Sequence, residues 1–293
     1  MEQYENRTRG WAERFESSRP HLRAVAYRML GSGGEAEDAV QESWLRLSRA
    51  DVLSIDNLEG WLTTVVARVC LDMLRSRKSR REDPPARQEP DPAASNPEQE
   101  AQLAESVGLA LLVVLDRLAP AERVAFILHD VFGVSFDDVA PVVERSTTAA
   151  RQLASRARRR VRATGTVSDA HLSEQKAVVD AFLTAVRTGD FDALVAVLDP
   201  DVVRRADAAV LSEAARELRG ARAVAEEALK YKEAARCSEP VLVNGSVGFL
   251  VAPGGRLRTA ISCNVKGGKI VEMDVIAEPT SLDGLKVMLL DET

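Results

Sequence analysis

The sequence predicts a multidomain protein in which two all-α modules, the second with a helix-turn-helix, are followed by an α+β domain. Three observations predict this fold class. Apolar residues recur at helical spacing between residues 19 and 162. A Pro-rich acidic stretch separates two groups of these helices. Beyond residue 240 the pattern changes to short apolar runs separated by Asn-Gly and Gly-Gly turns, and 293 residues suffice for two or three separate cores.

Charge is unevenly distributed along the chain. The formal net charge is −6, yet residues 145–162 carry seven arginines and no acid, whereas the charged residues of 83–105 are mostly acidic. Local fields therefore decide which partner each part attracts.

The cysteines, histidines and apolar runs exclude several classes of protein. The three cysteines are isolated and the three histidines lie far apart, so we expect no disulfide framework, no metal site and no cofactor. The first thirty residues contain no apolar segment of signal-peptide length, and no uninterrupted apolar run approaches about twenty residues. We therefore expect a cytoplasmic protein without a membrane partner.

Two helices are predicted near the N-terminus, over residues 19–30 and 35–47. The first stops at Gly31, because glycine readily adopts the left-handed backbone that ends a helix. The second has an apolar side and a polar side, and the polar side carries Asp38, Gln41 and Glu42. This polar side is either ordinary solvated surface or a docking face for another protein.

A third predicted helix, residues 57–81, is more informative. Helix-dipole complementarity explains two or three of the five cations at its end, which are Arg75, Arg77, Lys78, Arg80 and Arg81. All five cations together suit contact with a nucleic-acid backbone. The stretch before them, predicted to be exposed, includes Trp61, Thr63 and Thr64 and suits stacking of unpaired bases. A core position explains Trp61 equally well.

The middle of the chain begins with a linker. Prolines and acids between residues 82 and 100 predict an extended segment, because no packed element can form from them. Helices resume over residues 102–118 and, behind Pro120, over residues 121–132, where Gly133 ends the second of them.

Residues 135–162 predict a helix-turn-helix. The first helix spans 136–143 and buries its valines. A turn leads to Ser146, a good N-cap for a second helix that runs to about Arg162. The predicted inward stripe of this second helix consists of Leu153, Ala157 and Val161.

The second helix of this motif predicts DNA as a partner. Its arginines project from the faces outside the inward stripe, where they can follow a groove and its phosphates. Polar side chains of a size suited to reading bases lie at its start, namely Thr147, Thr148 and Gln152 beside Arg151. The alternative interpretation is a solvated basic helix end.

The helical part of the chain resembles a bacterial sigma factor of the extracytoplasmic-function group, the minimal type with only regions 2 and 4. The resemblance rests on EAEDAVQESWLRL, GWLTTVVARVCLDMLRSRKSRR and LDRLAPAERVAFILHDVFGVSFDDVAPVVERSTTAARQLASRARRR, in this order. It implies core RNA polymerase and promoter DNA as partners. It also implies region 2 in residues 1–82, an acidic Pro-rich linker in 83–105 and region 4 in 106–163.

The same resemblance implies roles for individual residues. The polymerase clamp would contact Asp38, Gln41 and Glu42. The melted downstream promoter element would be bound by Asn57, Trp61, Thr63, Thr64, Arg75, Arg77, Lys78 and Arg80. The upstream promoter element would be read in the major groove by Thr147, Thr148, Arg151, Gln152, Ser155 and Arg156.

Residues 168–293 extend beyond the minimal type. Asn244 and Gly245 between two apolar runs predict a hairpin, because both residue types tolerate positive φ. Helices followed by an antiparallel meander predict an α+β cone. We predict helices over residues 169–188, 191–198, 218–235 and 281–290, and strands over 202–206, 241–243, 247–251, 257–265 and 270–277.

The stretch FLTAVRTGDFDALVAVLDPDVVRRAD resembles the SnoaL-like fold, which some sigma factors of this group carry as a C-terminal extension. The resemblance implies a cone-shaped regulatory domain that modulates activity in cis. The Trp-Leu-Pro linker signature of such extensions is absent here. A hairpin motif of these extensions corresponds here to Lys266, Gly267, Gly268 and Lys269. Their closing motif corresponds to Glu278, Pro279 and Leu282.

The alternative function is a DNA-binding half fused to a SnoaL-like small-molecule enzyme or sensor. Enzymatic relatives of the fold place an Asp or His in the cone for proton transfer, and the candidates here are Asp199, Asp201 and Asp207. Asp199 and Asp201 also fit a turn after a helix. A carboxylate of raised pKa inside the cone would favour the enzyme, and an apolar interior would favour the sigma factor. We favour the sigma factor, without catalytic residues, and the sequence does not say whether the cone holds a ligand.

Overall fold

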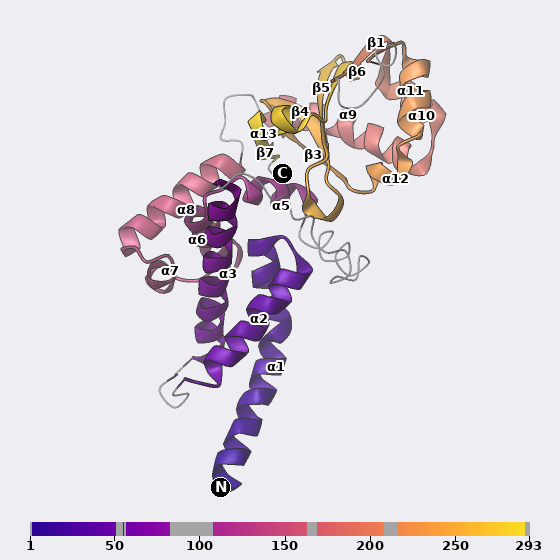
Figure 1. Ribbon diagram of the computed structural model, residues 1–293. Helices are drawn as coiled ribbons and strands as arrows, with labels where there is room; N and C mark the ends of the chain where they lie inside the picture. The colour runs from indigo at the N-terminus through magenta and orange to yellow at the C-terminus, as the bar shows by residue number, and fades with distance from the viewer. Residues whose placement is uncertain are drawn as a thin grey trace. The chain divides into compact units, whose positions relative to one another are not determined.

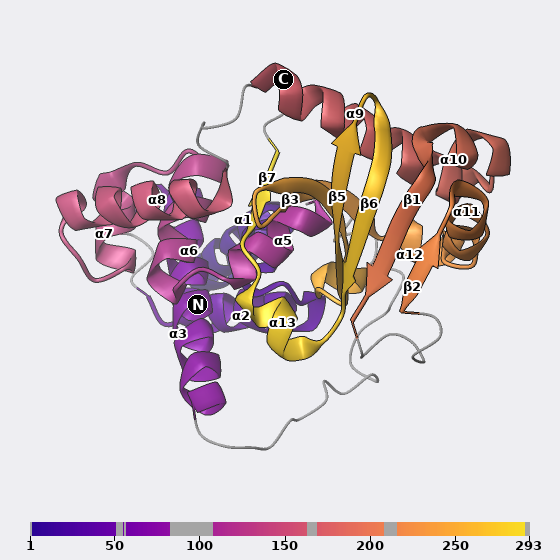
Figure 2. The same cartoon turned by 90° about the horizontal axis from the view of Figure 1, so that it is seen from above.

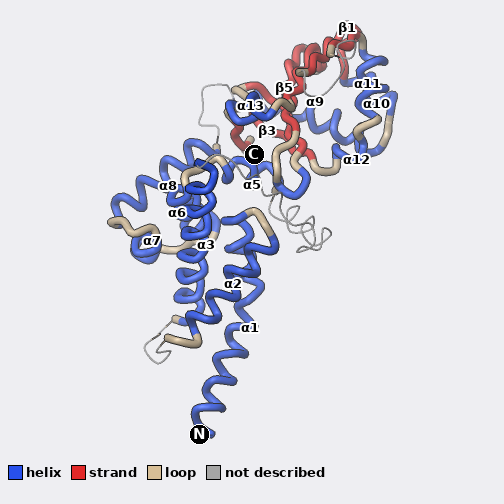
Figure 3. Tube along the Cα trace, in the orientation of Figure 1, coloured by secondary structure: helices blue, strands red, loops and turns tan. Residues whose placement is uncertain are grey.

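Helices form the first part of the chain in the computed structural model, which describes residues 2–50, 55, 57–82, 108–162, 169–207 and 216–290. The chain divides into two units, Met1–Ser106 with Leu115–Arg158 and Val107–Val114 with Arg159–Thr293. The first is helical, whereas the second contains all of the described strands (Figure 1, Figure 3). The predicted linker lies outside the described residues.

Three helices at the N-terminus, α1 (Glu2–Leu30), α2 (Gly33–Leu47) and α3 (Leu58–Glu82), pack on one another. Gly31, with a φ of 70°, ends α1 as predicted. Ser32 caps α2 by accepting a hydrogen bond from the Glu35 N–H at 3.4 Å, so this helix starts two residues before the predicted position. Fully buried side chains of their shared core include Leu22, Met29, Val40, Leu62 and Val66.

The next segment holds the helix-turn-helix. It consists of α5 (Leu109–Asp116), α6 (Pro120–Phe126), the π-helix η2 (Ile127–Val131), α7 (Phe136–Val142) and α8 (Thr147–Val161). Within the first unit, α3 contacts both α6 and α7. The boundary between the two units falls inside α5 and inside α8.

Helices α9, α10 and α11 of the second unit lie against a seven-stranded sheet with the strand order β2-β1-β6-β5-β4-β3-β7 (Figure 2). Strands β3 to β6 form the predicted antiparallel meander, and β1 pairs with β6 in parallel. The helices are α9 (Asp169–Thr188), α10 (Phe191–Val197), α11 (Ala221–Leu229), α12 (Lys232–Ala235) and α13 (Pro279–Gly284). The strands are β1 (Leu198–Ala206), β2 (Glu217–Arg219), β3 (Ser238–Val243), β4 (Ser246–Val251), β5 (Thr259–Lys266), β6 (Lys269–Ile276) and β7 (Val287–Leu289), and the short helix η4 (Pro253–Gly255) follows β4.

Two helix predictions for the second unit are only partly correct. The predicted helix 218–235 contains the helices α11 and α12, but its first residues belong to β2, because residues 217–219 complete the sheet edge beside β1. The predicted helix 281–290 is instead the short α13 followed by β7, whose Val287 to Leu289 pair with β3. Long-range strand pairing overrides helical spacing in both segments.

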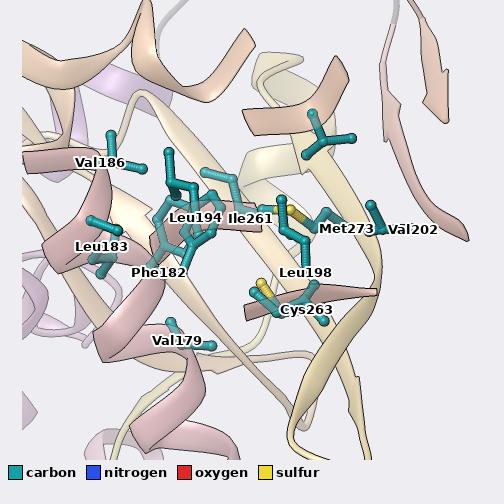
Figure 4. Packing of buried hydrophobic residues seen from close by; sticks show 14 of the residues in the cluster. Val179, Phe182, Leu183, Val186, Leu194, Leu198, Val202, Ile261, Cys263 and Met273 are labelled. Atoms are coloured by element: carbon teal, nitrogen blue, oxygen red, sulfur yellow. The ribbon is translucent and has the colours of Figure 1, made fainter. Parts of the chain in front are cut away.

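The core of the second unit is apolar and lies between the helices and the sheet (Figure 4). Phe182 and Leu183 of α9 meet Leu194 of α10 there, together with Ile261 and Met273 of the sheet. The predicted fold class, two all-α modules followed by an α+β domain, is confirmed. No helix among the described residues has both the length and the apolar character needed to cross a membrane.

Gly248 marks a close approach of β4 to β5. A Cβ at this position would lie 2.0 Å from the Ile261 carbonyl oxygen, which is backbone and cannot rotate away. We therefore expect Gly248→Ala to destabilise the second unit by about 3 kcal/mol. Urea unfolding followed by circular dichroism measures this. The control is Gly267→Ala, where a Cβ meets nothing within 4 Å and only the positive φ of 56° opposes alanine, which costs about 1 kcal/mol. Equal losses for the two variants would contradict the prediction.

Candidate nucleic-acid and polymerase interfaces

The recognition helix α8 presents a continuous polar face. Ser146 caps it as predicted, since its hydroxyl accepts from the Ala149 N–H at 3.3 Å. Glu144 makes the preceding turn with a φ of 56°. All six residues predicted to read the upstream element lie on α8. Thr147 is half-buried, and the other five are exposed: Thr148, Arg151, Gln152, Ser155 and Arg156. Their spacing places them on neighbouring positions of one helix face.

A stack of planar groups supports the start of this face. The rings of His129 and Phe136 are stacked, with centroids 3.8 Å apart. The Arg151 guanidinium lies over the Phe136 ring, 5.7 Å from the ring centroid. Such a cation–π contact restricts where the guanidinium points. Phe136 was not predicted to have this role, although an aromatic residue in a largely exposed first turn was a usable signal.

The inward side of α8 differs slightly from the predicted stripe. Ala157 and Val161 are buried as predicted, but Leu153 is only half-buried, and Ala150 and Ala154 take its place. Alanines allow α8 to approach its neighbours closely, so the buried stripe shifts toward them. One predicted phosphate-facing cation is also engaged elsewhere, because Arg158 pairs with Asp130 at 2.9 Å.

In the structure, one exposed apolar side chain, Leu45, adjoins the predicted polymerase-binding face of α2. Asp38 and Gln41 are exposed, and Glu42 accepts a hydrogen bond from Arg46 at 3.1 Å. Leu45 follows them at helical spacing and is 41% exposed, one of the few exposed large apolar side chains among the described residues. Leu45 was not among the residues predicted for this face, although its position outside the buried stripe of α2 was a signal.

A hollow of about 310 Å³ adjoins this face between α2 and α3. It is lined by Glu35, Glu42, Arg46, Val69, Asp72, Met73 and Ser76. Three carboxylates and one guanidinium line the hollow, so its charge does not favour a nucleic-acid backbone.

The start of α3 holds the first group of predicted downstream-element residues. Asn57 is exposed and its side-chain oxygen accepts from the Gly60 N–H at 3.0 Å. Trp61 and Thr64 are partly exposed. The expectation that Thr63 is exposed is wrong, because only 4% of it is accessible and its hydroxyl donates to the Glu59 carbonyl at 2.9 Å.

The cations at the end of α3 are not equivalent. Arg77 is half-buried, contacts Glu35 and donates to the Leu30 carbonyl at 3.0 Å, so it joins the end of α3 to the ends of α1 and α2. Arg75 is more exposed and pairs with Glu144 of the helix-turn-helix at 3.2 Å. Lys78 is exposed, and the Arg80 side chain lies outside the described residues.

Two of the three aspartates considered as catalytic candidates, Asp199 and Asp207, accept hydrogen bonds from backbone N–H groups, and the third, Asp201, is exposed. Asp199 accepts from the Asp201 N–H at 2.9 Å, the contact of a turn. One oxygen of Asp207 accepts from the N–H groups of Ala277 and Glu278, both at 2.7 Å. Asp207 therefore holds the segment that includes the predicted regulatory residues Glu278, the exposed Pro279 and the buried Leu282.

The other predicted regulatory group is the turn between β5 and β6. Gly267 and Gly268 have φ values of 56° and 75°, which the tight turn requires, and Lys266 and Lys269 are paired across it. Nearby on β6, burial and the charge of Glu272 raise the pKa of Asp274, but Arg205 contacts both carboxylates. Asp274 is exposed and is not part of the apolar core.

A capped basic recognition helix, a separate basic helix end and an acidic face with one exposed leucine fit the class of promoter-recognition proteins. The sequence matches the family described as sigma-70 region 2 over residues 14–80 and the one described as sigma-70, region 4 over residues 108–161.

Two similar relatives come from Mycobacterium tuberculosis. The probable ECF RNA polymerase sigma factor SigI is 34% identical over 99% of each chain, and the ECF RNA polymerase sigma factor SigJ is 38% identical over 92% of each chain. The crystal structure of SigJ aligns with a TM-score of 0.43 and 33% identity over 93% of this chain and 98% of that chain. The chain belongs to the extracytoplasmic-function RNA polymerase sigma factors. Members of this family bind core RNA polymerase and promoter DNA, and the chain acts in promoter-specific initiation of transcription.

Proposed function

We propose that the chain binds core RNA polymerase through the α2 face of Asp38, Gln41, Glu42 and Leu45, and reads promoters through α3 and α8. The observation that carries this proposal is the exposed face of α8, where Arg151 is oriented by Phe136 behind a capped turn. We propose the domain division predicted from the sequence: region 2 in 1–82, linker in 83–105, region 4 in 106–163 and regulatory domain in 168–293.

Within this proposal, the downstream element is bound by the partly exposed residues of α3. Asn57, Trp61 and Thr64 offer polar and aromatic contacts at its start, and Lys78 offers charge at its end. Arg80 is retained in the proposal from the sequence alone. Arg75 contributes once it leaves Glu144, an exposed ion pair that costs at most about 1 kcal/mol to break. Arg77 acts mainly by holding the end of α3 in place.

The C-terminal domain is proposed to modulate this activity in cis, without catalysing a reaction. The segment held by Asp207 and the turn from Lys266 to Lys269 are the proposed regulatory elements. A domain attached to the recognition helix makes its contacts intramolecular, so even a weak interface is substantially occupied. A bias of a few kcal/mol is enough to shift a two-state equilibrium.

Transcription with purified core polymerase tests this proposal. Full-length protein should direct initiation at specific promoters of a genomic template library, where core polymerase alone gives no defined start sites. A chain ending at Arg162 should change the amount of specific transcript, with an increase if the domain is purely inhibitory, and a chain ending at Glu278 should shift it in the same direction. Absence of specific start sites with folded full-length protein would contradict the sigma-factor role. Unchanged transcript from both folded truncations would contradict control in cis.

A further inference from the structure

We infer that Glu239 of the C-terminal domain supplies the N-cap of α5, so that this domain determines where the first helix of region 4 begins. The inference rests on the proposed control in cis and names the contact through which it acts. Residues 108–161 match region 4, yet the structure groups Val107–Val114 with the C-terminal domain.

The start of α5 lacks a cap from its own sequence. The first N–H groups of a helix have no partner within the helix and need an acceptor. Val107 and Gly108 precede α5 and carry no side-chain acceptor, and its first turn contains no acid. Gly108 has a φ of 85°, which turns the chain sharply into the helix.

A residue 130 positions further along the chain fills this role. The two carboxylate oxygens of Glu239 accept from the N–H groups of Leu109 at 2.7 Å and Ala110 at 3.0 Å. A carboxylate is well suited to this place, because its hydrogen bonds are charge-assisted and the helix dipole is positive there. Glu239 lies in β3 and pairs with Leu250 of β4, so the sheet fixes its position.

A second contact lies one turn further along α5. A Cβ added at Gly255 of η4 would lie 2.7 Å from the Leu112 Cδ1 and 3.1 Å from the Leu112 Cβ, so alanine at this position requires Leu112 to shift. Glu239 lies in β3, whereas Gly255 lies in η4, which follows β4. Both contact the first half of α5.

These contacts decide whether the first turn of α5 forms. A helix of eight residues is unstable by itself, so its ends depend on tertiary partners. Leu109 and Ala110 are 7% and 2% exposed. A change in the C-terminal domain that moves β3 away removes both acceptors at once, which unwinds the first turn and lengthens the segment that precedes region 4. The cap therefore couples the state of the domain to region 4.

Amide hydrogen exchange of the full-length chain tests the cap directly. In Glu239→Ala, the Leu109 and Ala110 amides should exchange about tenfold faster than in the wild type, the size of effect that loss of an N-cap produces. Glu239→Gln should lie between the two, because the amide keeps one acceptor oxygen. The matched control is Glu233→Ala, which removes a side chain that is 78% exposed and pairs with Arg236 in the same domain. Exchange at Leu109 and Ala110 that is the same in Glu239→Ala and Glu233→Ala would overturn the inference.

Adjacent glycines provide a second, independent pair of variants. Gly254 and Gly255 both have positive φ, but a Cβ at Gly254 meets nothing within 4 Å, whereas one at Gly255 meets Leu112. Both alanine variants carry the same kind of backbone strain. Only Gly255→Ala should increase exchange in the first turn of α5, and an equal increase in both would contradict the role of the Leu112 contact.

Transcription then separates the inference from the proposed function. Glu239→Ala should change specific transcript in the same direction as removal of the domain, by about fivefold, and Glu233→Ala should not. If removal of the domain changes transcription but Glu239→Ala does not, control in cis stands and the cap is not its route. If exchange responds to Glu239→Ala while removal of the domain leaves transcription unchanged, the cap exists and control in cis is wrong.

Discussion

Reversing the charge of the α2 face, with Asp38→Lys and Glu42→Lys together, is expected to abolish assembly with core RNA polymerase. Like charges brought together at an interface cost several kcal/mol, so the dissociation constant should rise by at least about a hundredfold. Stability should change little, because Asp38 is exposed and Glu42 contributes only a surface contact with Arg46. A fluorescence titration with core enzyme measures the affinity, and thermal unfolding checks the fold.

Two further variants make this result specific to α2. Glu13→Lys with Glu233→Lys changes the net charge by the same amount at exposed positions elsewhere, and should leave the affinity within about twofold. Leu45→Ala should weaken binding by about tenfold, because a side chain that is 41% exposed in the free protein becomes buried on docking. Unchanged affinity after charge reversal would remove the assignment of this face to the polymerase.

Replacing Arg151 is expected to abolish discrimination between promoters at the upstream element. A bidentate contact of arginine with a base discriminates by about 1 to 3 kcal/mol, so Arg151→Ala should lower specific binding by about 10- to 100-fold. Arg151→Lys should do nearly the same while retaining the charge, since lysine cannot make the bidentate contact. Binding of specific and random duplexes at several salt concentrations measures both effects.

Two other residues of region 4 separate base reading from general attraction. Arg160→Ala should weaken binding to all duplexes evenly and reduce the slope of affinity against salt by about one unit. Phe136→Leu keeps an apolar residue but removes the ring under Arg151, so it should reduce specific binding with little effect on random DNA. Equal losses on specific and random DNA for Arg151→Ala would show that Arg151 does not read bases.

Local signals in the sequence predicted most elements that carry function. Ser146 before an arginine-rich helix predicted the start of α8, and Gly31, Gly133 and the Asn244–Gly245 pair predicted the ends and turns that the structure contains. These predictions depend on the conformations that single residues allow. A cap or a positive φ is a property of a few neighbouring residues, and the sequence states it directly.

Other predictions failed where distant segments compete for the same residues. The terminal segment has helical spacing but becomes β7, because β3 offers it a row of unpaired backbone groups. Thr63 and Arg77 were expected to face nucleic acid, yet the packing of α3 against α1 and α2 buries Thr63 and engages Arg77 with Glu35.

The sequence by itself determined the class of protein, the order of its modules and the polar residues available on α2, α3 and α8, because periodicity and turn chemistry are local. The tertiary structure alone decided which side chains meet: Phe136 under Arg151, Arg75 on Glu144, Asp207 at Ala277 and Glu239 at the start of α5. No local pattern encodes such pairs, since each joins residues brought together only when the apolar faces of separate elements pack and their unpaired polar groups need partners.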